Sequence, residues 1–365
     1  MGKPLNVGII GCGKIISQYL ETIARVDDLN LVAVADLDMS RAQEVADSVP
    51  GTVALSVDDL IADDRIDAVV NLTIPAAHAD VSLRIIAAGK AVYVEKPITS
   101  TTAEAVQVLD AAREAGVIVG CAPDTVLGTG IQTARKAIDD GLIGTPISAT
   151  ATMVTPGHER WHPNPDFYYV PGGGPLLDMG PYYVSALVTL LGPIARVVGA
   201  SSATRGTRTI QSGARTGETI AVTTPTHVTG VLVHESGVLS TLVMSFDAVA
   251  TRASNIEIHG EGGSLAVPDP NYFEGEVRVH PLGATEWTTL PVSAGYRGAA
   301  RGYGLVEMLW NGSDSGALAE SRASGALAFH SLEVMESLLL SADTGVSIDI
   351  KSTAQRPEAV ELSER

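Results

Sequence analysis

The chain has 365 residues, 45% of them hydrophobic, which is enough for two domains with a sizeable core. Its formal net charge of −18 argues against a nucleic-acid or anionic-membrane surface, because such surfaces need clustered Lys and Arg side chains. We interpret the acidity as a source of solubility.

The N-terminus lacks the features of an export signal. Residues 1–4 lead directly into an apolar run, with no h-region and no twin arginine. No apolar segment approaches the roughly 20 residues that a membrane-spanning helix needs. Cys12 and Cys121 each end a predicted buried strand, which favours reduced packing thiols over a disulfide. These features predict a cytoplasmic protein without a membrane partner.

The first third of the chain alternates short β-branched runs with helical patterns. Continuous apolar strands are typical of a parallel sheet that is covered on both faces. The alternation of strand and helix indicates a doubly wound α/β domain. We predict strands over residues 5–10, 31–35, 68–72, 91–94 and 118–121, and helices that begin at Ile15, Ser40, His78 and Thr101.

The composition changes after a predicted amphipathic helix over residues 129–140. Gly, Pro and Thr become frequent, and two β-rich runs, 228–234 and 238–246, flank a plausible hairpin turn at residues 235–237. The sequence therefore predicts an α/β domain over residues 1–122 and an α+β domain with a largely antiparallel open sheet over residues 123–365. The second domain also contains a predicted strand at 255–259 and predicted helices at 176–191 and 325–340.

A glycine turn between the first strand and the first helix is a candidate nucleotide site. Gly11 permits a tight turn, and Gly13 lets a pyrophosphate approach the backbone at the helix N-terminus. The third position of this fingerprint holds Ile16 instead of Gly or Ala, which weakens the pattern. Asp36 ends the second strand, where a carboxylate binds the adenosine ribose and repels a 2′-phosphate. The pattern favours NAD over NADP, although Arg41 offers a contact to a phosphate.

Several short motifs follow one another along the chain. They are Gly11-Cys12-Gly13, Asp36, the run at 71–78, Ala88-Gly89-Lys90 leading to Glu95-Lys96-Pro97, and the run at 172–182. As an ordered set they resemble the glucose–fructose oxidoreductase/inositol dehydrogenase/rhizopine catabolism (Gfo/Idh/MocA) family. The resemblance implies a Rossmann domain followed by an α+β domain, and NAD(P)-linked oxidation or reduction of sugars, cyclitols and related polyols. It also implies a homo-oligomer, which we expect to form through the C-terminal sheet.

Lys96 matches the family's catalytic lysine. It follows an apolar strand, and ligands of such folds bind beyond the carboxyl ends of the strands. Oxidation of a secondary alcohol removes a hydride and a proton, and a positive charge near the oxygen stabilises the developing alkoxide. We expect Pro97 to fix the turn and Glu95 to orient the lysine or the nicotinamide.

Asp178 and Tyr182 are four residues apart, so they lie on the same face of a predicted helix. The family commonly has Asp-x-x-x-His at this spacing, with the histidine as proton acceptor. Tyr182 stands in its place here and is one candidate for that role. His162 is the other, because histidine titrates in the useful range. Asp178 is expected to orient the substrate hydroxyl or Lys96.

The loop over residues 157–163 is polar and aromatic. Trp161 can stack on a sugar face, and His158, Glu159 and His162 can bind hydroxyls. No metal site is predicted from these residues, because no partner spacing supports one. Asp124 stands where the family often carries Arg or Asn, and we assign it to the substrate side as well.

These arguments give two sets of site residues and one leading function. The expected function is NAD-dependent hydride transfer from or to a secondary hydroxyl of a sugar, glycoside or cyclitol. A non-catalytic dinucleotide-binding sensor and an NAD(P)H-dependent ketone reductase are the alternatives. The cofactor set is Gly11, Gly13, Lys14, Ile15, Asp36, Arg41, Thr73, His78, Glu95 and Lys96. The substrate set is Lys96, Asp124, His158, Trp161, His162, Asp178 and Tyr182, with Lys96, Asp178, Tyr182 and His162 as catalytic candidates.

Overall fold

The structure is a computed structural model that describes residues 4–312 and 318–364. The start of the chain over residues 1–3, on which the prediction about export partly rests, lies outside the described residues. The chain divides into two compact units. Unit 1 comprises Met1–Leu127 and Ala299–Phe329, and unit 2 comprises Gly128–Gly298 and His330–Arg365. The predicted single boundary at 122/123 differs from this division, because residues 299–329 return to unit 1.

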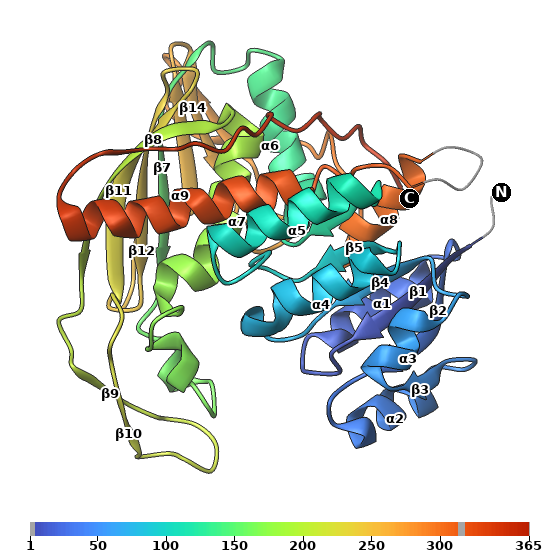
Figure 1. Ribbon diagram of the computed structural model, residues 1–365. Helices are drawn as coiled ribbons and strands as arrows, with labels where there is room; N and C mark the ends of the chain where they lie inside the picture. Colours follow the sequence, from blue (N-terminus) through green and yellow to red (C-terminus); the bar gives the residue numbers. More distant parts are fainter. Residues whose placement is uncertain (1–3, 313–317, 365) are drawn as a thin grey trace. The chain divides into compact units, whose positions relative to one another are not determined.

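Unit 1 is built on a parallel sheet with helices between its strands (Figure 1). The described strands are β1 (Leu5–Ile10), β2 (Leu29–Ala35), β3 (Val53–Leu55), β4 (Ala68–Asn71), β5 (Ala91–Val94) and β6 (Val119–Cys121). The described helices are α1 (Ile16–Arg25), α2 (Met39–Ser48), α3 (Val57–Ala62), α4 (Pro75–Ala87), α5 (Thr102–Ala115) and α8 (Tyr303–Trp310), with a short 3₁₀ turn η1 (Thr125–Leu127). The strand order is β3-β2-β1-β4-β5-β6. This is the doubly wound arrangement that the sequence predicts, and the prediction is confirmed.

The core of unit 1 lies in the strands that the sequence identified. Val7, Ile9, Val34, Val70 and Tyr93 are fully buried. Their apolar strands run continuously because helices cover both faces of a parallel sheet. The sequence did not predict β3 or α3, since a strand of three residues carries too short a pattern to detect.

Unit 2 is built on a larger sheet with the order β16-β15-β14-β13-β7-β12-β11-β8-β17. Among the described strands of this sheet, β7 and β12 pair in parallel and the other pairs are antiparallel, which confirms the predicted largely antiparallel sheet. Its strands are β7 (Pro146–Val154), β8 (Ile194–Ser202), β11 (His227–His234), β12 (Leu239–Ser245), β13 (Ile256–Gly260), β14 (Gly263–Val267), β15 (Arg278–Pro281), β16 (Thr288–Thr289) and β17 (Ile348–Asp349).

Further elements complete unit 2. The strands β9 (Thr207–Thr209) and β10 (Thr219–Ala221) pair as a separate arm, which extends away from the large sheet (Figure 1). The helices are α6 (Thr129–Asp139), α7 (Gly174–Leu191) and α9 (Gly325–Thr344), of which α9 enters unit 2 at His330. Two short 3₁₀ turns, η2 (His158–Arg160) and η3 (Asp166–Tyr168), lie in the segment between β7 and α7.

A pair of glycines lets α9 approach the large sheet closely. Gly199 in β8 and Gly230 in β11 are register partners. A Cβ atom at Gly199 would lie 2.3 Å from the backbone oxygen of Leu338, and one at Gly230 would lie 2.5 Å from the Leu338 side chain. Because neither position has a side chain, α9 packs directly against the backbone of the sheet there.

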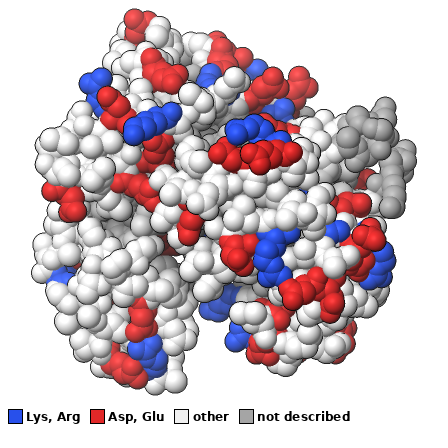
Figure 2. Space-filling model, in the orientation of Figure 1, with Lys and Arg blue, Asp and Glu red and all other residues white. Residues whose placement is uncertain are grey.

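Charged side chains on the face seen in Figure 2 are scattered, and Lys and Arg residues stand mostly beside Asp and Glu. This face shows no continuous basic patch of the kind that binds nucleic acid. Within residues 4–312 and 318–364, no helix is both long enough and apolar enough to cross a membrane. Cys12 and Cys121 are buried free thiols, as expected.

A buried histidine gives unit 2 a pH-dependent stability. The Nδ1 atom of His234 donates to the carbonyl oxygen of Gly192 at 2.7 Å, and Nε2 accepts from the Ser240 hydroxyl at 2.8 Å. These two partners suit the neutral ring, because a carbonyl oxygen can only accept. Burial lowers the pKa of His234 to about 4.

We predict that the free energy of unfolding falls as the pH falls from about 6.5 towards 4. The folded-state pKa of His234 lies below its ordinary value, so its stabilising contribution is complete above pH ~6.5 and is lost as the pH falls towards 4. The lost contribution is at most about 3 kcal/mol. Urea unfolding at a series of pH values should show a shallower decline for His234→Asn than for the parent. Equal slopes in this window would contradict the assignment.

Candidate active site

The glycine turn after β1 has two glycines with different tasks. Gly11 has a φ of +104°, and a Cβ atom there would lie 2.5 Å from the backbone oxygen of Leu72. Gly11 is therefore required by the fold itself. A Cβ atom at Gly13 would meet nothing within 4 Å. This open space lies just before the N-terminus of α1, where backbone N–H groups favour an anion such as a pyrophosphate.

Asp36 is fixed at the end of β2 by two backbone N–H groups. Its Oδ2 atom accepts from the Cys12 N–H at 2.7 Å, and Oδ1 accepts from the Asp38 N–H at 2.8 Å. The carboxylate thus ties the glycine turn to the start of α2. Burial, followed by the charge of Asp36, raises the pKa of the Cys12 thiol to about 11. Cys12 is consequently a packing thiol and not a nucleophile.

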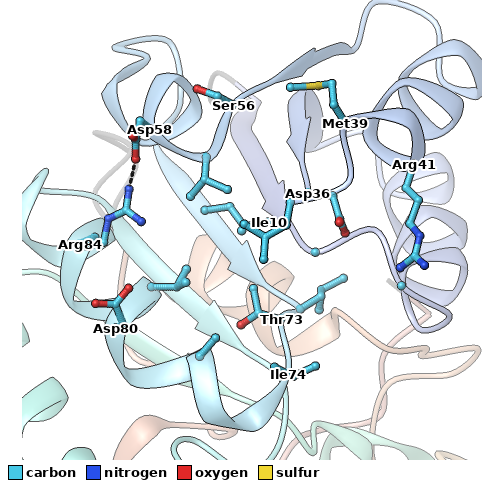
Figure 3. Close-up of a pocket in the computed structure, with 17 residues that line it drawn as sticks. Ile10, Asp36, Met39, Arg41, Ser56, Asp58, Thr73, Ile74, Asp80 and Arg84 are labelled. Carbon is cyan, nitrogen blue, oxygen red and sulfur yellow. Dashed lines mark hydrogen bonds and ion pairs between the residues drawn. The ribbon is translucent and has the colours of Figure 1, made fainter.

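A cavity of about 710 Å³ opens beside these residues (Figure 3). It is formed by the ends of β1, β2 and β4, by the first turns of α2 and α3, and by one side of α4. Of the predicted cofactor residues, Gly11, Gly13, Asp36, Arg41 and Thr73 line it. The cavity lies at the carboxyl ends of the strands, where doubly wound folds bind nucleotides.

The far rim of the cavity carries residues that the sequence did not indicate. Asp58 at the start of α3 forms an ion pair with Arg84 of α4, and Ser56 and Asp80 lie nearby (Figure 3). The sequence offered no signal for Ser56 and Asp58, because they belong to the start of α3, which was not predicted.

His78 connects two turns of unit 1. Its Nδ1 atom lies 2.6 Å from the carbonyl oxygen of Pro97, and Nε2 lies 3.0 Å from that of Thr73. The side chain is buried, and burial lowers its pKa. His78 is not one of the residues that line the cavity. It links the Thr73 turn to the turn that follows Lys96.

Glu95 holds the backbone of Lys96. The Glu95 Oε1 atom accepts from the hydroxyl of Tyr19 at 2.9 Å, and Oε2 accepts from the Lys96 N–H at 2.9 Å. Glu95 itself is buried. The carboxylate therefore fixes the position at which the Lys96 side chain leaves the strand end.

Asp124 has a buried role in unit 1. Its Oδ2 atom accepts from the N–H groups of Gly302 at 2.7 Å and Gly304 at 3.1 Å, at the start of α8. Burial raises its pKa. This bond joins the returning segment 299–329 to the end of the parallel sheet. It differs from the contact with substrate that the sequence predicts for Asp124.

In unit 2 the structure brings His158 and Asp178 together. The Nε2 atom of His158 lies 3.1 Å from Oδ2 of Asp178, and the indole N–H of Trp161 donates to His158 Nδ1 at 3.2 Å. Tyr182, one turn later on α7, is buried. His162 packs edge-on against Trp161, Phe167 and Tyr168, with ring centroids between 5.3 and 5.6 Å apart.

Buried charged side chains hold the segment that carries His158, Trp161 and His162 in place. Glu159 is buried and accepts from the Tyr169 hydroxyl and, at 3.2 Å, from Arg208 of β9. Arg208, only 3% exposed, also donates to Asp247 at 2.5 Å. Glu159 therefore pairs with a side chain of the arm, and the expectation that it binds a substrate hydroxyl is not supported. No motif in the sequence indicates Arg208 as its partner.

The exposed part of the loop is aromatic. Trp161 is 56% exposed and Phe167 is 54% exposed, although both belong to a cluster of touching rings. Exposed aromatic faces of this kind suit the apolar faces of sugar rings. Among the described residues, no group of three or more His, Cys, Asp or Glu side chains is arranged to hold a metal ion.

Two family models match the chain. The model described as "Oxidoreductase family, NAD-binding Rossmann fold" matches residues 5–122, and the model described as "GFO/IDH/MocA C-terminal domain" matches residues 131–266. Together they cover well over half of the sequence.

Curated relatives are similar at modest identity. A 1,5-anhydro-D-fructose reductase from Ensifer adhaerens is 29% identical over 71% of this chain and 74% of its own length. A dTDP-3,4-didehydro-2,6-dideoxy-alpha-D-glucose 3-reductase from Streptomyces violaceoruber is 30% identical over 54% of this chain and 58% of its own length. An inositol 2-dehydrogenase from Saccharopolyspora erythraea is 32% identical over 40% and 44%, respectively. The chain thus spans about half the length of the last two.

Solved structures share the fold. An NAD-binding oxidoreductase from Klebsiella pneumoniae has a TM-score of 0.81 at 22% identity, covering 96% of this chain and 100% of that chain. Levoglucosan dehydrogenase in complex with NADH and L-sorbose has a TM-score of 0.79 at 18% identity, with the same coverage.

The two glycines of the turn should respond differently to alanine. Gly11→Ala should lower the free energy of unfolding by more than about 2 kcal/mol, because the new Cβ atom meets the Leu72 backbone in a strained conformation. Gly13→Ala should leave stability within about 1 kcal/mol of the parent and weaken dinucleotide binding at least about tenfold. Urea unfolding and calorimetric titration measure the two effects. A Gly13→Ala variant that binds normally would contradict this division of tasks.

The buried charges beneath the loop should be costly to disrupt. Arg208→Met leaves Glu159 without its cationic partner, and we expect a loss of about 3–5 kcal/mol in unfolding free energy. The matched control is Arg205→Met, whose exposed side chain lies 3.9 Å from Asp247. Its loss should stay below about 1 kcal/mol. Similar losses in the two variants would show that burial does not set the strength of the network.

Proposed function

Because the chain belongs to the Gfo/Idh/MocA oxidoreductase family, we propose that it transfers a hydride between NAD and a secondary hydroxyl of a sugar, glycoside or cyclitol. The observation that carries the proposal is the placement of Lys96. It leaves the end of β5 from a backbone that Glu95 holds, in the same unit as a cavity with the glycine turn and Asp36.

Lys96 supplies the positive charge in this proposal. When a hydride leaves the carbon of a secondary alcohol, negative charge develops on its oxygen, and a fixed ammonium group stabilises that charge. The nicotinamide supplies the hydride chemistry when it is bound. In the direction of reduction, the same charge polarises the carbonyl group of a ketone. The reductase names of two relatives favour including this direction.

Unit 2 supplies substrate recognition in this proposal. Asp178 accepts from a substrate hydroxyl, and the exposed rings of Trp161 and Phe167 contact apolar faces of the substrate. The relatives named above act on sugar derivatives or on inositol, which supports a polyhydroxylated substrate. Tyr182 and His162 stay candidates for the group that exchanges the proton.

We assign NAD, and not NADP, as the preferred nucleotide. The Asp36 carboxylate lines the cavity while its two oxygens accept from backbone N–H groups, so its charge is held where the ribose hydroxyls of an adenosine would bind. A 2′-phosphate at that point would face a like charge. Arg41 also lines the cavity, but it lies 3.4 Å from Asp38 in an ion pair.

The large sheet of unit 2 is the expected contact between copies of the chain. Val198 and Val231 are register partners on β8 and β11, and both are more than one-third exposed. Leu239 at the start of β12 adds a third exposed apolar side chain. These neighbouring exposed apolar side chains support a homo-oligomer.

Replacing the charge of Lys96 tests the proposed reaction. A polyol panel assayed with NAD identifies a substrate, and Lys96→Met should then lower turnover by about 10²-fold or more. The matched control is Lys136→Met, which removes an exposed lysine of α6 that pairs with Asp140. It should retain parental activity. Turnover of Lys96→Met within about tenfold of the parent, with an inert control, would contradict the role of Lys96.

A further inference from the structure

We propose that His158 is a positioning residue for Asp178 and that Trp161 and Asp178 together fix the tautomer of His158. This inference rests on the proposed function for its kinetic consequences, whereas its structural part is independent of any substrate. It starts from two hydrogen bonds that occupy both nitrogens of one imidazole.

The partners of the ring determine where its proton resides. The indole N–H of Trp161 can only donate, so Nδ1 of His158 presents its lone pair to it at 3.2 Å. The proton of the neutral ring is then on Nε2, which faces Oδ2 of Asp178 at 3.1 Å. His158 therefore donates to the carboxylate. Fixing the tautomer through the second nitrogen is a general means of orienting a histidine and its partner.

The surroundings of His158 restrict the motion of the ring. The ring packs in a tilted arrangement against Phe246 and in an edge arrangement against Tyr168, with ring centroids 4.3 and 4.7 Å away. Its backbone N–H donates to the Tyr169 hydroxyl at 3.1 Å, and that hydroxyl donates to Glu159. The residue is 8% exposed. The imidazole thus holds one orientation, and the Asp178 carboxylate that it contacts shares that restriction.

These contacts distinguish positioning from proton exchange. Both nitrogens of His158 are engaged, so the ring would have to break a hydrogen bond before it could take a proton from a substrate. Its effect is exerted through Asp178. Trp161 has a double role in this proposal, because its N–H donates to His158 while the side chain is 56% exposed. The same side chain therefore contacts a sugar ring and, through His158, orients Asp178.

The structural part is tested by ¹⁵N spectra of the histidine rings, with His158→Gln providing the assignment. The parent should show the Nε2–H tautomer at His158. The double variant Trp161→Phe/Asp178→Asn should introduce the Nδ1–H form, because no indole then donates to Nδ1 and an amide N–H can donate to Nε2. The matched control is Trp287→Phe, because Trp287 packs edge-on against a different histidine, His280, with ring centroids 5.4 Å apart. It should leave the His158 signal unchanged. A parental Nδ1–H tautomer would overturn the proposal.

The kinetic part uses a substrate from the polyol panel. His158→Ala should lower kcat/KM for that substrate by about 10- to 100-fold, the range seen when a group that orients a functional side chain is removed. The affinity for NADH should stay within about twofold of the parent. His158→Gln should recover much of the loss, because its amide N–H can donate to Asp178.

The outcomes separate this inference from the proposed function. If His158→Ala keeps kcat/KM within about twofold of the parent, or if His158→Gln is no better than His158→Ala, the positioning role is wrong even though the enzyme turns over. If no polyol supports turnover, the proposed function fails, and the ¹⁵N spectra still decide whether Trp161 and Asp178 fix the tautomer of His158.

Discussion

The hydrogen bond from the Cys12 N–H to the Asp36 carboxylate is the interaction on which the cofactor side of this protein depends. The parallel pairing of β1 and β2 places Ile10 beside Ala35, so the two strands end together. The positive φ of Gly11 then turns the chain, and the next N–H meets Asp36 at 2.7 Å. The same carboxylate accepts from Asp38 at the start of α2. One charge thus sets the shape of the turn and the electrostatics of the cavity beside it.

In unit 2 the main structural requirement is that a polar aromatic loop keeps one conformation. Loops lack the regular backbone hydrogen bonds of a sheet or helix, and precise sites need support from surrounding residues. Here Arg208 of the arm donates to Glu159 and to Asp247. The hydroxyl of Tyr169 accepts a hydrogen bond from the backbone N–H of His158. A buried network of charged side chains adds little net stability, but its hydrogen bonds form only in a narrow range of geometries. Such a network can therefore hold the loop in the one conformation that orients Asp178.

The sequence predicted the parts of the fold in which local pattern and tertiary environment agree. The strands β1 and β5 begin and end where their apolar runs do, because both are buried on two faces. The glycine turn and Asp36 were predicted for the same reason, since their roles follow from local backbone geometry. The missed elements have other causes. The strand β3 is too short for a pattern. The return of residues 299–329 to unit 1 involves contacts between distant parts of the chain, such as the bond between Asp124 and Gly302, which are 178 positions apart.

The site residues divide in the same way. Lys96 and Asp178 were identified from motifs, whereas the partner of Asp178 was not, because His158 reaches it from a loop 20 positions earlier. Glu159 was expected to bind a substrate hydroxyl, but it accepts a hydrogen bond from the buried side chain of Arg208, which belongs to the arm. The expected histidine one turn after Asp178 is Tyr182 in this chain. An imidazole nevertheless contacts Asp178, and it comes from outside the helix.

The most direct measurement is the affinity of the unmodified protein for NADH and for NADPH, titrated calorimetrically under identical conditions. The fixed charge of Asp36 predicts that NADH binds at least about tenfold more tightly, which corresponds to ~1.4 kcal/mol. Equal affinities, or tighter binding of NADPH, would contradict the role of Asp36 and with it the assignment of this cavity to NAD.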